Sequence, residues 1–195
     1  LQTNIKRMLG YSSIAHIGYL LIVLMVLLNA QSQALAREAA LFYLIAYTTT
    51  TIAAFGLLTL ISAEREDREQ VQLQQISGLF WQRPVLAGLM MVALLSLAGI
   101  PLTAGFIAKF YLFGAAVSGE NWVLLAALII GSAIGIYYYL RVIYYMTRRV
   151  EEHEAQVQTS LSWDGRLVSC ALIAIVLLLG TLPQPLIAYL QSILQ

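Results

Sequence analysis

An apolar run from Val85 to Val117 constrains the fold of this chain more than any other feature, and Lys109 is its only charged residue. About 20 apolar residues suffice for one helix to cross the hydrocarbon core of a bilayer. The run is therefore too long for a single straight crossing. Gly99, Pro101 and Gly105 lie in its middle, which predicts an interruption there.

Proline removes a backbone donor and clashes with the preceding helical turn, and glycine tolerates the dihedral angles of an unwound link. We therefore expect a discontinuous membrane helix. Lys109 lies just beyond the expected break, where an ammonium group is costly unless it is paired, hydrated or neutralised. A lysine that extends its amine to the lipid headgroups is the alternative. Apolar residues continue from Phe110 to Val117, so we favour an ion path.

The composition supports a membrane protein, with 60% hydrophobic and 11% charged residues, against about half and a quarter in soluble domains. The net charge of +1 argues against a nucleic-acid partner. Cys170 is the single cysteine, so this chain alone cannot build a disulfide, a zinc site or an iron–sulfur cluster. With no dinucleotide fingerprint or phosphate loop either, we expect no bound cofactor or metal, and any redox chemistry on another polypeptide.

Hydropathy divides the chain into five expected transmembrane helices, so we predict an all-α polytopic protein with one membrane domain over residues 1–195. The expected spans are about 8–28, 39–62, 85–117 (the discontinuous one), 122–146 and 167–190.

Loop charges predict how the spans are oriented. One side carries eight basic residues, Lys6, Arg7, Arg65, Arg68, Arg83, Arg148, Arg149 and Arg166, and the other side carries Arg37 alone. We therefore expect the N-terminus and the 63–84 and 147–166 loops to be cytoplasmic. The 29–38 and 118–121 loops and the C-terminus would face outward.

Two further residues are candidates for chemistry. His16 lies within the first expected span, where it is either a hydrogen-bonding group between helices or a proton relay. Lys6 is either a cytoplasmic anchor or part of a helix that begins before it and carries it inward. Threonines at 48–51 either line a hydrated path or bond back to carbonyls. The tyrosines at 137–139, with Tyr144 and Tyr145, are typical of an aromatic belt near the cytoplasmic interface.

Several motifs resemble a known family. Residues 2–13 together with 16–19 are similar to the antiporter-like subunits of proton-pumping NADH:quinone oxidoreductase, respiratory complex I. Residues 95–110 resemble the second broken helix of those subunits. The second span carries Tyr43 and Tyr47 where two branches of the family usually carry histidines and a lysine, and in this it resembles the bacterial subunit N branch.

The resemblance implies a fourteen-helix antiporter-like fold, of which the five spans would be the tenth to fourteenth. The chain opens on Leu1 in the middle of a motif, so we expect the C-terminal portion of a longer subunit in a bacterial inner membrane, with a periplasmic C-terminus. By position, Lys109 matches the lysine of the second half-channel, and Lys6 matches another lysine of that half. We predict a proton relay of Lys109, Lys6 and His16.

The same resemblance implies that NADH, FMN, iron–sulfur clusters and quinone bind to other subunits of the complex. Partners would be the lipid bilayer and other membrane-arm subunits, including further antiporter-like ones. Two alternatives stay open: a subunit of a multisubunit cation/proton antiporter, and a structural membrane scaffold in which Lys109 forms a static ion pair.

Overall fold

The computed structural model describes residues 2–27, 33–62, 71–149 and 163–194. Within these ranges the chain is helical, with an isolated β-bridge between Asn4 and Gln72 as the only extended pairing. This confirms the predicted all-α class. The helices are α1 (Ile5–Leu27), α2 (Gln33–Ser62), the short 3₁₀ helix η2 (Leu73–Ile76), α3 (Leu79–Gln82), α4 (Pro84–Ala98), α5 (Ala104–Ser118), α6 (Trp122–Thr147), α7 (Trp163–Thr181) and α8 (Gln184–Leu194).

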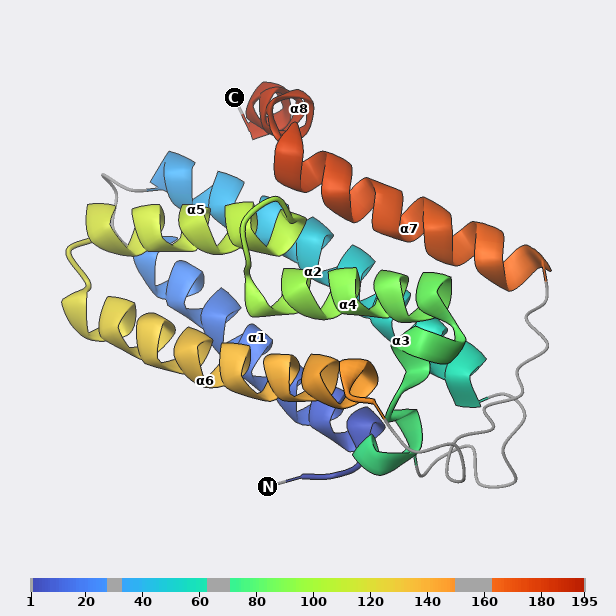
Figure 1. The fold of residues 1–195 in the computed structure, drawn as a ribbon. Coiled ribbons are helices and arrows are strands. Elements are labelled where there is room, and N and C mark those ends of the chain that lie inside the picture. The colour runs from blue at the N-terminus through green and yellow to red at the C-terminus, as the bar shows by residue number, and fades with distance from the viewer. Residues whose placement is uncertain (1, 28–32, 63–70, 150–162, 195) are drawn as a thin grey trace.

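Three helices in the described part of the chain, α1, α2 and α6, are individually long and apolar enough to cross a membrane. Helix α1 packs against both α2 and α6, and all three extend through the length of the molecule (Figure 1). Helices α4 and α5 have 15 residues each. At 1.5 Å per residue each is shorter than a hydrocarbon core of about 30 Å. The predicted number of five spans therefore requires that α4 and α5 together make one crossing of the membrane.

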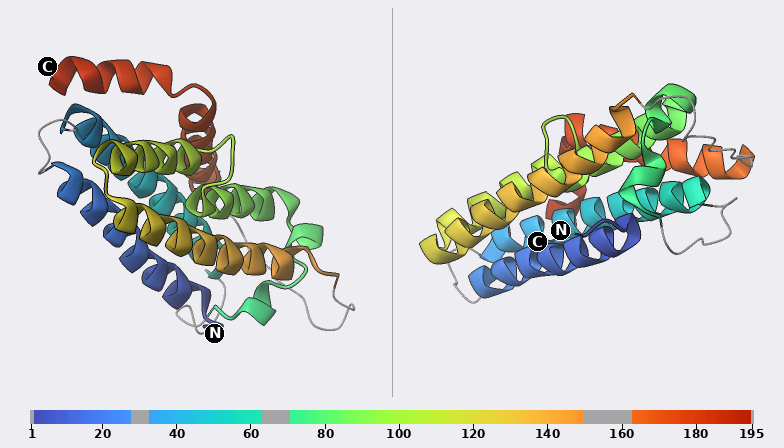
Figure 2. Two further views of the ribbon diagram at one scale, coloured as in Figure 1. Left: turned by 90° about the vertical axis from the view of Figure 1, so that its left-hand side faces the viewer. Right: turned by 60° about the horizontal axis from the view of Figure 1, so that its bottom comes forward.

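The link between α4 and α5 comprises residues 99–103, so the two helices end and begin around the expected interruption. Gly99 adopts a left-handed conformation with φ 82°, and its N–H donates to the carbonyls of Leu95 and Ser96. This is a common way to end a helix, because glycine pays no Cβ penalty there. Figures 1 and 2 show α4 and α5 following each other in roughly the same direction, joined by the protruding link.

The predicted fifth span, residues 167–190, is not one continuous helix. Helices α7 and α8 meet at an angle of 79°. Pro183 lies at the junction, where it lacks the N–H needed to continue the helix and disfavours the helical conformation of the residue before it. Hydropathy alone missed this bend because both sides of it are apolar. Figure 2 shows α8 turning sharply away from α7.

The segment before α4 is tied to the N-terminus. The N–H of Ile5 donates to the carbonyl of Val71, and the N–H of Leu73 donates to that of Thr3, both at 2.9 Å. The indole of Trp81 donates to the carbonyl of Thr147 at 2.8 Å. These bonds hold the described part of the predicted 63–84 loop against one end of the bundle. Residues 63–70 and 150–162 of the two predicted cytoplasmic loops lie outside the described residues.

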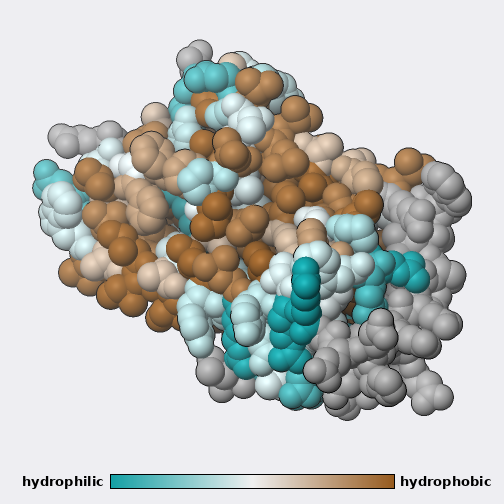
Figure 3. Space-filling model, viewed as in Figure 1, coloured by the Kyte–Doolittle hydropathy of each residue, from teal (hydrophilic) through white to brown (hydrophobic). Residues whose placement is uncertain are grey.

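Small and apolar side chains form the interior, and large apolar ones also cover the outside. Ile14, Ile130 and Leu178 are each more than half exposed, as expected for helices whose solvent is lipid. Figure 3 shows a broad apolar band across the middle of the visible face, with hydrophilic residues gathered near the lower end of the helices. The bundle has the surface of a membrane protein.

Candidate functional site

Lys109 is buried at the centre of the bundle, with 5% of its surface exposed. It lies in the second turn of α5, and helical side chains lean toward the N-terminus of their own helix. This direction takes the amine toward the end of α4, where Nζ donates to the backbone oxygen of Ala98 at 2.7 Å. The carbonyl is available because the helix stops there. The break therefore supplies the partner that the buried ammonium needs.

Gly99 makes room for the lysine side chain. A Cβ at this position would lie 2.7 Å from Cδ of Lys109 and 3.2 Å from Nζ. The side chain thus passes directly over the first residue of the link. Its amine also lies 5.8 Å from the centre of the Tyr19 ring, a distance at which an aromatic face attracts a cation.

Ser96 connects α4 and α5 to α2. Its hydroxyl accepts from the N–H of Gly105 at 3.1 Å, and so satisfies a donor at the start of α5 that has no partner within the helix. The same oxygen lies 3.2 Å from the hydroxyl of Thr50 on α2. Gly105 is required for this approach, because its Cβ would lie 1.8 Å from the backbone oxygen of Ser96.

His16 lies opposite Lys109, on α1, with 4% of its surface exposed. Its Nδ1 is 2.6 Å from the hydroxyl of Tyr43 on α2, and its Nε2 is 3.2 Å from the hydroxyl of Tyr139 on α6. Its ring stacks on Tyr47 with 4.7 Å between centroids. The histidine therefore makes hydrogen bonds between helices, which was one of the two interpretations left open by the sequence.

The position of Tyr139 corrects one expectation. The 137–139 tyrosines were expected to form an aromatic belt at the interface, but Tyr139 is 1% exposed and contacts His16 in the interior. The three residues point to different sides of α6 because successive helical residues are rotated by about 100°. Tyr137 alone has the expected exposure, at 58%.

A small cavity separates His16 from Lys109. It offers about 10 Å³ to the centres of water molecules and is lined by both residues and by Tyr47, Thr50 and Ser96 among others. This volume is about the minimum that holds one water.

A second cavity, of about 280 Å³, lies on the other side of Lys109. Its walls come from the link, α5 and α6, and include Phe106, Phe110 and Ser132. Lys109 lines both cavities. Lys109 therefore borders two separate, mainly apolar cavities, and the smaller one also has His16, Thr50 and Ser96 in its wall.

Lys6 is not brought into this group. It lies in the first turn of α1, ten positions before His16, which places the two about 15 Å apart along the helix axis. Its membership of the relay stays a prediction. The sequence-based prediction did not single out Tyr43, Tyr47, Ser96 and Tyr139 as site residues. Thr50 belongs to the threonines with two open interpretations, and it both lines the small cavity and bonds back to the carbonyl of Ala46. For the α2 residues there was a signal, since positions 43, 47 and 50 share one helical face.

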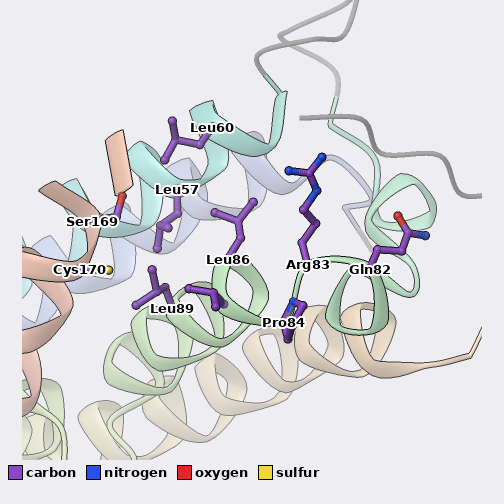
Figure 4. Close-up of a pocket in the computed structure, with 10 residues that line it drawn as sticks. Leu57, Leu60, Gln82, Arg83, Pro84, Leu86, Leu89, Ser169 and Cys170 are labelled. Atoms are coloured by element: carbon purple, nitrogen blue, oxygen red, sulfur yellow. The ribbon is translucent and has the colours of Figure 1, made fainter. Parts of the chain in front are cut away.

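A further cavity lies elsewhere in the bundle. It has a volume of about 300 Å³ between α2, α4 and α7 (Figure 4), and its labelled lining residues are Leu57, Leu60, Gln82, Arg83, Pro84, Leu86, Leu89, Ser169 and Cys170. Its walls are mainly apolar, and it does not share residues with the cavities at Lys109. Within the described ranges no group of three or more histidine, cysteine or acidic residues is placed to hold a metal ion.

Apolar helices around a buried lysine and histidine define a multi-pass membrane protein with an internal polar site. The chain belongs to the NADH:quinone oxidoreductase/Mrp antiporter transmembrane family, whose model matches residues 1–135. It is 47% identical over 193 residues to NADH-quinone oxidoreductase subunit N of Ectopseudomonas mendocina (strain ymp). That alignment covers 96% of this chain and 37% of the relative, so the chain spans little more than a third of the relative's length.

Solved structures give the same relationship. A chain of respiratory complex I from Thermus thermophilus with bound aureothin matches with a TM-score of 0.79 and 34% identity, over 96% of this chain and 40% of that one. A chain of the archaeal membrane-bound sulfane sulfur reductase matches with a TM-score of 0.71 and 27% identity, over 92% and 28%. A chain of the Mrp complex from Dietzia sp. DQ12-45-1b shares the fold, with a TM-score of 0.82 and 19% identity over 99% and 42%.

Proposed function

We propose that this chain is the C-terminal portion of a proton-translocating, antiporter-like subunit of NADH:quinone oxidoreductase. It forms part of one half-channel, and it carries no redox centre. Electrons pass from NADH through FMN and iron–sulfur clusters to quinone on other subunits, and the released energy reaches this chain through neighbouring membrane-arm subunits. The 47% identity to a subunit N supports this assignment.

The observation that carries the proposal is the position of the Lys109 amine. Nζ is buried, bound to the Ala98 carbonyl at the end of a broken helix, and placed between two cavities. A charged amine in such surroundings costs free energy unless it is compensated. A change in nearby charge therefore decides whether the amine keeps its proton. This is the property that a proton-loading site requires.

His16 and Lys6 complete the proposed relay. His16 is the partner across the small cavity, with tyrosine hydroxyls on both ring nitrogens. An imidazole in such a chain can accept a proton on one nitrogen and release one from the other. Lys6 lies in the first turn of α1, at one end of the bundle. It would pass protons from that end along α1 toward His16.

We further propose that α4 and α5 together make one discontinuous crossing, which gives five spans. The bias of basic residues toward residues 1–7, 63–84 and 147–166 supports a cytoplasmic location for those segments. The C-terminus then lies on the periplasmic side of a bacterial inner membrane.

The second candidate, a subunit of a cation/proton antiporter without a redox partner, has the same fold. The description of the family covers both kinds of complex. The Mrp likeness supports the fold alone at 19% identity, and the oxidoreductase relative is much closer. Proteins that purify with the full-length subunit separate the two, since flavin and iron–sulfur subunits accompany an oxidoreductase only.

The test uses Lys109→Met in the full-length subunit within its assembled complex. Methionine is similar in length but cannot hold a proton. We expect proton pumping per NADH oxidised to fall sharply while the amount of assembled complex is kept. Arg37→Met is the matched control, because Arg37 is exposed on α2 and bonds only locally to Gln33. Full pumping by an assembled Lys109→Met complex contradicts the proposal.

A further inference from the structure

The link between α4 and α5 is an unusual piece of backbone. Leu102 has a positive φ of 73°, although its side chain is 68% exposed. Residues other than glycine seldom adopt this conformation, and it costs about 1 kcal/mol or more unless the surroundings enforce it. Thr103 helps by donating its hydroxyl to the carbonyl of Ile100 at 2.7 Å. The exposed Leu102 side chain does not supply the enforcement, so the backbone of the link must be held in another way.

Gly180 on α7 supplies the missing contact. A Cβ there would lie 2.3 Å from the carbonyl carbon of Thr103, 2.4 Å from its Cα and 2.5 Å from the carbonyl oxygen of Leu102. All three are backbone atoms, so no side-chain rotation can relieve the clash. The backbones of α7 and the link are therefore in direct contact at this point, and only glycine permits it.

The contact distinguishes Gly180 from four glycines in α1, α2 and α4. A Cβ added at Gly10, Gly18, Gly56 or Gly88 would meet nothing within 4 Å. Those positions tolerate alanine as far as space is concerned. Gly180, in contrast, is buried where α7 faces α5 and the link. The absence of a side chain at Gly180 therefore matters for the contact between α7 and the link.

Helix α7 is itself held firmly in this position. Its buried residues Ile173 and Val176 lie on the same side as Gly180. Beyond the 79° bend, α8 packs on α2 and buries Ile187 and Leu190. An α7 that is fixed along its length and at its end cannot easily retreat from a larger residue at position 180, so the link must move instead.

We infer that Gly180 is a positioning residue for the Lys109 site: its backbone contact with Thr103 holds the link so that the Ala98 carbonyl stays within reach of the Lys109 amine. The link begins one residue after Ala98, and Gly99 within it packs on the lysine side chain. A displacement at Thr103 is therefore transmitted over a few bonds to the amine's partner. This inference rests on the proposed function of Lys109 in proton transfer.

The test compares Gly180→Ala with Gly56→Ala in the full-length subunit within its complex. Three quantities are measured: the amount of assembled complex, the rate of NADH oxidation, and protons pumped per NADH as a function of pH. Misplacing a reacting group by about 1 Å can cost up to ~100-fold in rate. We expect Gly180→Ala to lower pumping per NADH at least severalfold and to change its pH profile. Gly56→Ala should leave both unchanged.

A merely structural role changes the amount of complex but leaves pumping per NADH and its pH profile in the remaining complex as in wild type. That result overturns the inference. If Gly180→Ala does not assemble, Leu102→Gly is added to it, because glycine accepts the positive φ and frees the link to adapt. Recovery of assembly with low pumping per NADH then supports the inference, and failure of the double variant to recover contradicts it.

Lys109→Met keeps this test separate from that of the proposed function. If Lys109→Met pumps normally, the proposed function fails and the inference fails with it. If Lys109→Met stops pumping and Gly180→Ala does not, the inference alone is wrong.

Discussion

Within the described residues, two pairs of consecutive apolar helices are each separated by a short break that contains a proline, and the two breaks differ in what surrounds them. Residues 99–103 separate α4 from α5 and include Pro101, and residues 182–183 separate α7 from α8 and include Pro183. At the first break the Ala98 carbonyl accepts from the buried Lys109 amine. At the second, Thr181 donates its hydroxyl to the carbonyl of Leu177 at 2.8 Å. Donor and acceptor of this hydrogen bond both belong to α7.

The difference shows that proline and glycine break a helix but do not make a site. A break becomes a site when the freed carbonyl meets a cation, and when neighbouring helices add hydroxyl and imidazole groups beside it. The first break has Ser96, Thr50 and His16 within its small cavity. The second break turns the chain so that α8 packs on α2. This packing of α8 holds α7 in place beside the first break.

The largest effect is expected at Gly105, the glycine that lets the start of α5 lie close to the end of α4. Gly105→Ala places a methyl group against the backbone oxygen of Ser96, and overpacking of this kind costs about 1–3 kcal/mol. Thermal unfolding of the purified full-length subunit should show the loss. Gly88→Ala, with nothing within 4 Å, should be neutral or stabilising, since alanine is favoured over glycine in helices. Equal melting temperatures for the two variants contradict the packing described here.

The polar groups beside the first break should be the next most sensitive. Tyr43→Phe removes the hydroxyl 2.6 Å from Nδ1 of His16 and leaves that buried nitrogen without this partner, at a cost of about 1–3 kcal/mol. We expect lower stability and slower pumping. Tyr137→Phe, at a tyrosine that is 58% exposed, serves as the control for loss of a hydroxyl. A wild-type melting temperature for Tyr43→Phe excludes an energetic role for this hydrogen bond.

The two prolines provide a direct comparison of the breaks. Replacing a proline whose conformation fits the native backbone costs about 0.4–1 kcal/mol through the entropy of the unfolded chain. We expect Pro101→Ala and Pro183→Ala to lose similar stability. Pumping per NADH should fall for Pro101→Ala alone, because the link with Pro101 directly follows Ala98, whose carbonyl accepts from Lys109. An equal effect of both variants on pumping removes the functional distinction between the breaks.

The smallest effect is expected where α8 meets α2 through an exposed contact. Gln191 donates its amide to the Glu38 carboxylate at 3.1 Å. Gln191→Ala should change the free energy of unfolding by less than about 0.5 kcal/mol. Leu190→Ala, which truncates a buried side chain of the same helix, is expected to cost about 2 kcal/mol or more. The reverse order in chemical denaturation shows that α8 is not held by apolar packing.

The sequence was sufficient for the helical class, the family resemblance and the candidates Lys109 and His16. An interruption near Gly99 and Pro101 could be predicted because glycine and proline act locally. The bend at Pro183 was missed, since hydropathy does not register a change of direction between two apolar segments. The placement of Tyr139 also could not be predicted, because periodicity does not separate lipid-facing from buried sides in uniformly apolar helices.

The contact between Gly180 and the link shows a further limit. Residues 103 and 180 are distant in the chain, and a single glycine near the end of an apolar helix has no distinctive pattern around it. Only the packing of α7 against the link identifies it. The proline and glycine signals found the break, and the tertiary structure shows what holds the break in shape.

Lys109→Arg tests the central claim most directly, in comparison with Lys109→Met in the assembled complex. Arginine keeps the positive charge but does not release its proton in proteins. If Lys109 works by gaining and losing a proton, the arginine variant pumps as poorly as the methionine variant. If arginine restores pumping per NADH to the wild-type value, a fixed charge is sufficient, and the account of Lys109 as a proton-loading site is contradicted.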